Sequence, residues 1–417
     1  MDDPVGGPTR LASAERTITR TFQSLRTRNF RLFYIGQSIS NTGNWLTNVA
    51  LILFVLQLTG SGLAVGILTA CQFGPLLFLS AWAGAVADRV EKRRMLIATQ
   101  ALEMAQSTGL AIVAFLPRPS LLVLYALAVG GGVVLALDNP LRRSFVPEMV
   151  PEDDLPNAVV LYSTIISLSQ IFGPTLAGLL ATTLGFGWCF TIDAASYLAV
   201  IACLAMMRAS DLRPNPPAPR TRREVREGLR YVASVPDLWI SFAMFGAIGI
   251  FSFNLRVSLP LFVTLSLDGS EVAFTILYSI LSLGAVIGAL VVAQRRFVRL
   301  PHVIGGSIAF GLGMLLLAAM PSVAAAVPVV FLVGAASIVY RTATTSLAQV
   351  DIRRDMHGRV LALQTALMGG TALVGGPIVG RIADIGGGRA PIVVGGIVCL
   401  ITAGLGSLAR RRAAADT

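Results

Sequence analysis

The sequence predicts an all-α membrane protein whose twelve membrane-spanning helices form two six-helix halves. Hydrophobic residues make up 54% of the 417 positions, and charged residues make up only 13%. A soluble domain carries roughly a quarter charged residues, so this chain lacks the charge for a water-facing surface. The apolar residues form long runs, and one long polar stretch separates the first set of runs from the second. These observations together indicate a polytopic membrane protein with a duplicated architecture.

The apolar runs are long enough to cross a membrane, because a helix needs about 20 residues to span ~30 Å of hydrocarbon. Glycine and proline interrupt the runs, which spanning helices tolerate when neighbouring helices satisfy the freed backbone groups. Pairs such as Gly62/Gly66 and Gly284/Gly288 allow helices to approach closely. We expect the spans at 30–56, 63–87, 94–116, 120–138, 157–184, 187–207, 238–265, 272–293, 301–320, 324–341, 360–382 and 390–409.

The basic residues predict the orientation of the chain. Most of the 33 Lys and Arg residues fall in every second connection between the runs. Because cytoplasmic connections carry an excess of Lys and Arg, this pattern places both termini in the cytoplasm of a multi-pass plasma or inner-membrane protein. The net charge of +11 is therefore a topology signal. The basic residues do not form one patch with interleaved aromatic side chains, so we expect no nucleic-acid partner.

The long polar stretch defines the domain organisation. It begins with a proline-rich segment, typical of an extended linker, and continues into a basic amphipathic helix. Phe54-Val55 and Gly173-Pro174 reappear about half a chain later as Phe262-Val263 and Gly376-Pro377, which indicates duplication and a substrate site between the halves. The predicted parts are a cytoplasmic N-terminal segment (1–29), an N-terminal bundle (30–208), a cytoplasmic linker (209–236), a C-terminal bundle (237–409) and a cytoplasmic tail (410–417).

Three motifs resemble those of one transporter superfamily. Residues 84–94 read Gly-Ala-Val-Ala-Asp-Arg-Val-Glu-Lys-Arg-Arg and are similar to the major facilitator signature after the second helix, except that Glu91 stands where Gly is usual. Residues 138–158 resemble the loop between helices four and five in the drug-efflux and siderophore-export branch. Residues 173–178, Gly-Pro-Thr-Leu-Ala-Gly, resemble the antiporter motif of exporters, with Gln170 where an Arg often precedes it.

The resemblance implies a major facilitator fold and a set of latch residues on the cytoplasmic side. By this resemblance, Asp88 would cap the start of the eleventh helix near Arg359, and Arg89 would pair with Asp138. A carboxylate at a helix N-terminus meets unpaired N–H groups and the positive end of the helix dipole. Such a latch would hold the halves together on the cytoplasmic side when the transporter faces outward, and breaking and remaking it would let the halves rock about a central site. The complete predicted set is Gly84, Asp88, Arg89, Arg93, Asp138, Arg142 and Arg359, with Gly173, Pro174 and Gly178 as the antiporter motif.

Polar side chains within the runs are the candidates for substrate contact. Gln37, Asn41, Asn44 and Asn48 recur at helical spacing and form a stripe on one face of the first span. Such a stripe either lines a cavity or packs against a neighbouring helix. The resemblance, which places helices 1, 4, 7 and 10 around the cavity, favours the first. We assign Asn254 and Arg256 of the seventh span to the same cavity, where Arg256 would bind an anionic substrate group or pair with a carboxylate.

Two acidic residues in the spans are candidates for proton coupling. Glu103 lies in the third span and Asp193 in the sixth, where an unpaired charge costs several kcal/mol. A hydrogen-bonded structural role is the alternative for both, and for Glu103 it is favoured by the peripheral place of helix three in the family.

These observations predict a secondary transporter that exports small amphipathic molecules, such as drugs, toxic metabolites or siderophores, in exchange for protons. Dedicated uptake or export of a single metabolite and a non-transporting sensor are the alternatives. The chain has no HExxH, GxSxG or P-loop motif, so we expect neither an enzyme nor a catalytic, metal or cofactor site. The expected partners are the substrate, protons and the lipid bilayer, and we expect a monomer.

Overall fold

The computed structural model describes residues 22–87, 89–213, 224–293, 299–350 and 356–415. Helices form every regular element of these ranges, and no strand occurs in them. Large apolar side chains are exposed on the outside of the helices, including Leu122 at 78% and Phe78 at 73%. This exposure is expected for a surface that contacts lipid.

The N-terminal half contains six long helices. A short η1 (Gln23–Arg26) precedes them, and η2 (Glu152–Asp154) and η3 (Ala209–Asp211) lie before and after the last two. The helices are α2 (Arg28–Thr59), α3 (Gly62–Ala87), α4 (Lys92–Phe115), α5 (Leu121–Met149), α6 (Leu155–Thr183) and α7 (Phe186–Ala205).

The C-terminal half begins after a short helix, α8 (Glu224–Ser234), which lies where the sequence predicts an amphipathic linker helix. It packs against α9 (Pro236–Phe251) and α14 (His357–Gly386). The helices of this half are α9 (Pro236–Phe251), α10 (Leu255–Ser266), α11 (Glu271–Ala293), α12 (Leu300–Ala318), α13 (Val323–Val350), α14 (His357–Gly386) and α15 (Ala390–Ala415).

The two halves repeat the same packing. In the first half α2 packs against α6 and α7, α3 against α5, and α4 against α5 and α7. In the second half α9 packs against α14 and α15, α11 against α13, and α12 against α13 and α15. The order of partners is the same, which confirms the predicted duplication of a six-span unit. The halves contact each other mainly through α3 with α14 and through α6 with α11, which are equivalent pairs in this repeat.

The described residues contain 11 helical segments that are both long and apolar enough to cross a membrane. The expected third span is the exception: α4 has 24 residues, enough to cross, but many of its side chains are polar or charged. Three of them, Gln100, Glu103 and Ser107, are buried inside the bundle rather than exposed to lipid. An apolar-run criterion undervalues such a helix because it cannot tell a buried polar face from a lipid-facing one.

The helices differ from the expected spans in three places. α5 continues to Met149, so the expected loop after residue 138 is helical and includes Pro140 and Pro147. The seventh span is broken into α9 and α10 around residues 252–254. α15 continues through the predicted tail to Ala415, because its Arg and Ala residues favour helix. Residues 416–417 lie outside the described ranges.

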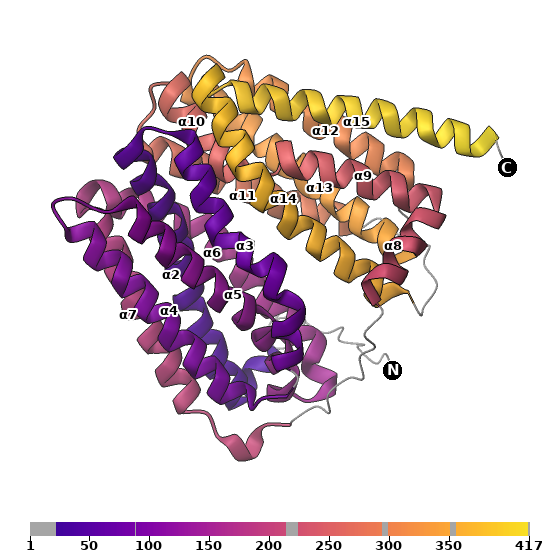
Figure 1. Cartoon of the computed structure of the whole chain (residues 1–417). Helices are drawn as coiled ribbons and strands as arrows, with labels where there is room; N and C mark the ends of the chain where they lie inside the picture. The colour runs from indigo at the N-terminus through magenta and orange to yellow at the C-terminus, as the bar shows by residue number, and fades with distance from the viewer. Residues whose placement is uncertain (1–21, 88, 214–223, 294–298, 351–355, 416–417) are drawn as a thin grey trace, which may run out of the picture.

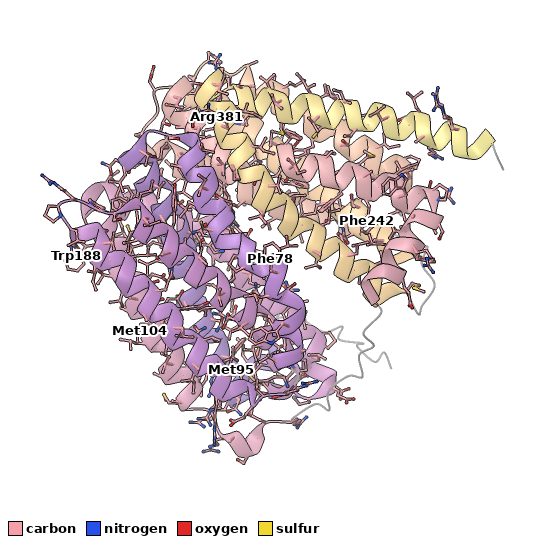
Figure 2. All side chains as sticks on the ribbon, viewed as in Figure 1. Phe78, Met95, Met104, Trp188, Phe242 and Arg381 are labelled. Carbon is pink, nitrogen blue, oxygen red and sulfur yellow. The ribbon has the colours of Figure 1, made fainter. Side chains whose placement is uncertain are left out.

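The halves meet at one end and diverge at the other (Figure 1). We call the side with the connections at 60–61, 184–185, 267–270 and 387–389 the meeting end, and the side where α2 begins and α15 ends the open end. Trp188 and Arg381 lie toward the meeting end and Met95 toward the open end (Figure 2). A continuous apolar core joins the two halves, and a second core, which includes Phe33 and Phe145, stays within the N-terminal half.

Candidate functional site

A network of buried polar side chains surrounds Arg142 inside the N-terminal half. Arg142 lies four residues after Asp138 on α5, so the two side chains share a helix face and form an ion pair. Arg142 also donates to the side-chain oxygen of Gln37 on α2 and, at 3.3 Å, to Glu103 on α4. Gln100 donates to Asp138 at 3.0 Å and to Glu103 at 3.1 Å. All five residues are at most 7% exposed, so the network joins α2, α4 and α5 out of reach of lipid.

A second buried carboxylate site lies beside this network. Asp193 of α7 is 0% exposed and accepts a hydrogen bond of 2.8 Å from the hydroxyl of Ser107 on α4. Ser196 donates to the same carboxylate at 3.5 Å. Because Ser107 lies one turn beyond Glu103 on α4, the polar face of this helix extends from the Arg142 network to Asp193. The described N-terminal half thus holds three buried carboxylates close to a single buried guanidinium.

The amide stripe of α2 also faces the interior of this half. Asn48 donates to the side chain of Asn44 at 2.8 Å, and Asn44 donates to the Tyr197 hydroxyl of α7 at 3.3 Å. Asn41 donates to the Gln37 side chain at 3.1 Å. A small cavity of about 50 Å³ lies beside the stripe. Its polar lining comes from several helices: Asn44, Asn48, Gln72, Glu103, Gln106 and Tyr197.

This placement corrects the expectation that the whole stripe lines the space between the halves. Gln37 is 1% exposed, because the buried guanidinium of Arg142 requires oxygen acceptors and Gln37 supplies one. Asn44 and Asn48 line the small cavity within the N-terminal half. That cavity has room for a water-sized species and is too small for an organic substrate.

Arg256 is held between the two halves. Its guanidinium carbon lies 4.5 Å from the ring centre of Trp45 on α2 and 5.2 Å from that of Phe73 on α3. Its Nε donates to the hydroxyl of Tyr278 on α11 at 3.1 Å. Two helices of the N-terminal half and one neighbouring helix of the C-terminal half therefore position this cation.

The break between α9 and α10 sets the place of Arg256. Asn254 donates to the carbonyls of Gly249 and Ile250 at 3.1 and 2.9 Å, which satisfies the end of α9. Asn254 is 6% exposed, so it caps a helix and does not face an open cavity as expected. Arg256 follows in the first turn of α10. Discontinuous helices of this kind surround the substrate sites of several transporter folds.

The halves touch at backbone level near the meeting end. A methyl group on Gly66 of α3 would collide with the backbone of Gly376 on α14, and one on Gly62 would lie 2.6 Å from the carbonyl oxygen of Gly380. Farther along the same helices the contact loosens, and a methyl group on Gly369 would be 3.6 Å from the Leu77 side chain. The two helices therefore cross at these four glycines and separate toward the open end.

Asp384, at the end of α14, caps the beginning of α3. Its carboxylate accepts hydrogen bonds from Gly62 N at 2.5 Å, Leu63 N at 3.0 Å and the Ser61 hydroxyl at 2.9 Å. The first N–H groups of a helix have no partner within the helix, and the helix dipole is positive there. The C-terminal half thus supplies an N-cap to a helix of the N-terminal half.

The antiporter-motif glycines also serve close helix packing. A methyl group on Gly173 of α6 would collide with Trp45 on α2, and one on Gly178 would collide with Thr275 on α11. Pro174 is buried next to Gly173 within α6. The motif therefore brings α6 against its own half through one glycine and against the other half through the second.

The basic cluster after α3 contacts its own half. Arg93 donates at 2.7 Å to the carbonyl of Leu204 and at 2.8 Å to that of Ala205, which lie at the end of α7. Cations at a helix C-terminus satisfy the last carbonyls and complement the helix dipole. Gly84 is buried in the last turn of α3.

The predicted Arg89–Asp138 pair is not formed in this conformation. Arg89 is exposed, whereas Asp138 is 1% exposed and paired with Arg142. The prediction treated residues 138 to 142 as a loop, but they lie within α5, where Asp138 and Arg142 face one another one turn apart. Asp88 and the side chain of Arg359 lie outside the described residues.

The family model described as "Transmembrane secretion effector" matches residues 19–416, which is nearly the whole chain. The chain belongs to this family of major facilitator transporters. The enterobactin exporter EntS of Salmonella typhimurium is 27% identical over 361 residues, which cover 83% of this chain and 85% of that protein. The staphyloferrin A transporter of Staphylococcus aureus is 29% identical over 180 residues, 42% of this chain and 45% of that one. These relatives are transporters and not enzymes.

Solved structures share the major facilitator fold. An inward-facing, unoccupied bacterial homologue of the human lysosomal transporter Spinster aligns with a TM-score of 0.71 at 15% identity, covering 93% of this chain and 97% of that one. A POT family transporter bound to a thioalcohol-conjugated peptide aligns with a TM-score of 0.73 at 12% identity, covering 94% and 99%. The predicted twelve-span architecture in two halves is therefore confirmed.

Several residues at these sites were missed by sequence reasoning. Gln100 and Ser107 follow the helical spacing of Glu103, so a search for polar periodicity along the third span could have found them. Asp384 ends a Gly-x-x-x-Asp pattern that begins at Gly380 and repeats the spacing of Gly84 and Asp88.

Proposed function

We propose that this transporter exports a siderophore-like small molecule from the cytoplasm in exchange for protons. The enterobactin exporter that it resembles covers most of its length, and its Gly-Pro-x-x-x-Gly segment at 173–178 matches the motif of antiporters. The basic connections support a cytoplasmic position of the open end, by the positive-inside rule. An exported substrate would then enter from the open end.

The observation that supports proton exchange is the excess of buried acidic residues in the N-terminal half. Glu103, Asp138 and Asp193 are all at most 4% exposed, and Arg142 is the one guanidinium paired with them among the described residues. Uncompensated charge inside a membrane costs several kcal/mol, so proton binding offsets part of this excess. The polar face of α4 links the sites through Ser107, and the small polar cavity beside Glu103 has room for water.

We infer that alternating access uses two reciprocal caps on the same pair of helices. At the meeting end, Asp384 of α14 caps the start of α3. By resemblance to the major facilitator signature, Asp88 would cap the start of α14 at the open end. We propose that the first cap holds the conformation open to the cytoplasm and that the second replaces it when the halves rock and close that side.

The test is transport by everted membrane vesicles, in which an exporter accumulates substrate inside. We expect energised vesicles to accumulate enterobactin and a protonophore to abolish the accumulation. Glu103→Gln and Asp193→Asn should each reduce gradient-driven accumulation at least tenfold, because the amides keep hydrogen bonds but cannot carry protons. The matched control is Glu152→Gln, since Glu152 is exposed in η2.

Three results would contradict the proposal. Accumulation that survives the protonophore would exclude proton exchange. Wild-type accumulation by both the Glu103 and Asp193 variants would remove these groups from the coupling. Accumulation in right-side-out vesicles alone would indicate uptake and would reverse the proposed direction. An ethidium control distinguishes a dedicated exporter from a broad efflux pump.

A further inference from the structure

The described residues leave the charge of Arg256 without a carboxylate partner. Its guanidinium contacts two aromatic rings and one tyrosine hydroxyl, and none of the ion pairs among described residues includes it. The described acidic residues inside the helices α9 to α15 are Asp237, Glu271 and Asp384, each in the first or last turn of its helix. No acidic residue in the described part of its own half therefore pairs with this cation.

A second cation belongs to the same half. Arg341 of α13 is exposed, and its positive charge and that of Arg256 repel each other. Arg256 also occupies the first turn of α10, where the helix dipole adds positive potential. The Arg256 guanidinium and the N-terminus of α10 thus place positive potential between the halves, next to the broken seventh span, and the charge of Arg341 adds to it.

We propose that Arg256 and Arg341 bind the acidic group of the transported substrate, while Trp45 and Phe73 pack against an aromatic ring of the same molecule. The substrate class is an aromatic acid or a larger molecule that carries such a unit. This inference deepens the proposed function and rests on it.

The chemistry of the site favours this class over a cationic or neutral drug. A guanidinium presents a planar fork of donors that matches a carboxylate or a catecholate in a bidentate manner. An aromatic ring attached to that acid reaches the rings that already flank Arg256, where offset or edge contacts contribute beyond area burial. A cationic ligand would meet two like charges and no described carboxylate at this position.

The site also connects substrate to conformation. Trp45 and Phe73 belong to the N-terminal half, whereas Arg256, Arg341 and Tyr278 belong to the C-terminal half. A ligand that contacts both sets of side chains binds most tightly in one arrangement of the halves, and it can shift the equilibrium only by that difference in affinity. Trp45 is moreover the residue against which Gly173 of the antiporter motif packs.

The experiment measures equilibrium binding of radiolabelled salicylate to the purified full-length protein. Salicylamide, which has the same ring without the acid, and cyclohexanecarboxylate, which has the acid without the ring, serve as competitors. We expect both to compete at least tenfold more weakly than unlabelled salicylate. Arg256→Gln and Arg341→Gln should each weaken salicylate binding at least tenfold, and Trp45→Leu about threefold or more. Arg389→Gln, a change of an exposed arginine at the meeting end, is the matched control.

Separate control experiments test whether each variant folds and whether the function is retained. Arg256→Lys keeps the charge and should recover part of the affinity, and each variant is compared by its melting temperature. Equal competition by salicylamide, unchanged binding in both arginine-to-glutamine variants, or no salicylate binding by the folded protein would each overturn the proposal. If protonophore-sensitive export of enterobactin persists in that last case, the site assignment fails while the proposed function stands. Charge-dependent salicylate binding without any export supports the site and contradicts the function.

Discussion

Removing the carboxylate of Asp384 should shift the protein away from the conformation that is open at the α2 and α15 ends. Asp384→Asn keeps the size of the side chain but replaces one acceptor oxygen by an NH₂ group. In the structure one oxygen of Asp384 accepts from Gly62 N, and the other accepts from both Leu63 N and the Ser61 hydroxyl. The one oxygen of the amide can accept the hydrogen bonds of only one of these two sides, and the neutral amide has no charge to interact with the helix dipole.

The magnitude follows from those contacts. Loss of an N-cap costs about 0.5–2 kcal/mol, and a charge at a helix N-terminus contributes about 0.3–1 kcal/mol. Since Asp384→Asn removes the charge and part of the cap, we expect a loss of about 1–2 kcal/mol of stabilisation of this conformation. That corresponds to a factor of about 5–30 in the equilibrium between the conformations.

Pulsed electron paramagnetic resonance can measure the shift. One spin label replaces the exposed Trp82 near the end of α3 and the other replaces the exposed Thr365 on α14, in a background without the four native cysteines. The population with a short distance between the labels should grow in Asp384→Asn. Asp268→Asn, at the same end, is the control. Unchanged distance distributions in Asp384→Asn would refute the view that this cap stabilises the open arrangement.

Two further predictions concern stability and packing. Arg142→Met should lower the stability of the N-terminal half by about 3–5 kcal/mol, because buried carboxylates lose their partner. Adding Asp138→Asn to this variant should recover part of the lost melting temperature. An Arg142→Met variant as stable as the wild type would contradict a stabilising role of the Arg142 network. Gly66→Ala should impair transport and reduce the population of the open conformation in the spin-label assay, because its methyl group meets the Gly376 backbone. Gly305→Ala is the control: the added methyl group has open space there, so transport and the population of the open conformation should stay unchanged.

Much of the architecture was predictable because the bilayer imposes a simple rule on sequence. Helices must present apolar residues to lipid for about 20 positions, so most spans could be counted directly. The repeat of Gly173-Pro174 at Gly376-Pro377 indicated two related halves, which the equivalent helix pairings confirm. The helix ends were less predictable, since the extension of α5 to Met149 has no continuous apolar run and buries scattered apolar side chains, such as Leu141 and Phe145, against other helices.

The site was predictable only as a set of unusual residues. Glu103, Asp193 and Arg256 stood out because charge inside a membrane is costly. Their partners did not stand out: Gln37 belonged to a stripe that could face either a cavity or a neighbouring helix. The structure brings Gln37 to Arg142, a residue 105 positions away along the chain.

The sequence by itself determined the membrane environment, the pattern of spans, the duplication and the superfamily that the motifs resemble, because these depend on composition, local periodicity and short motifs. Tertiary structure alone decided which buried charges share a network, where the seventh span breaks, and that Asp384 caps a helix 322 residues earlier in the chain. Two side chains form an ion pair or a hydrogen bond only when they lie close together in space. The distances between residues of the two six-helix halves are fixed only when both halves have folded and docked.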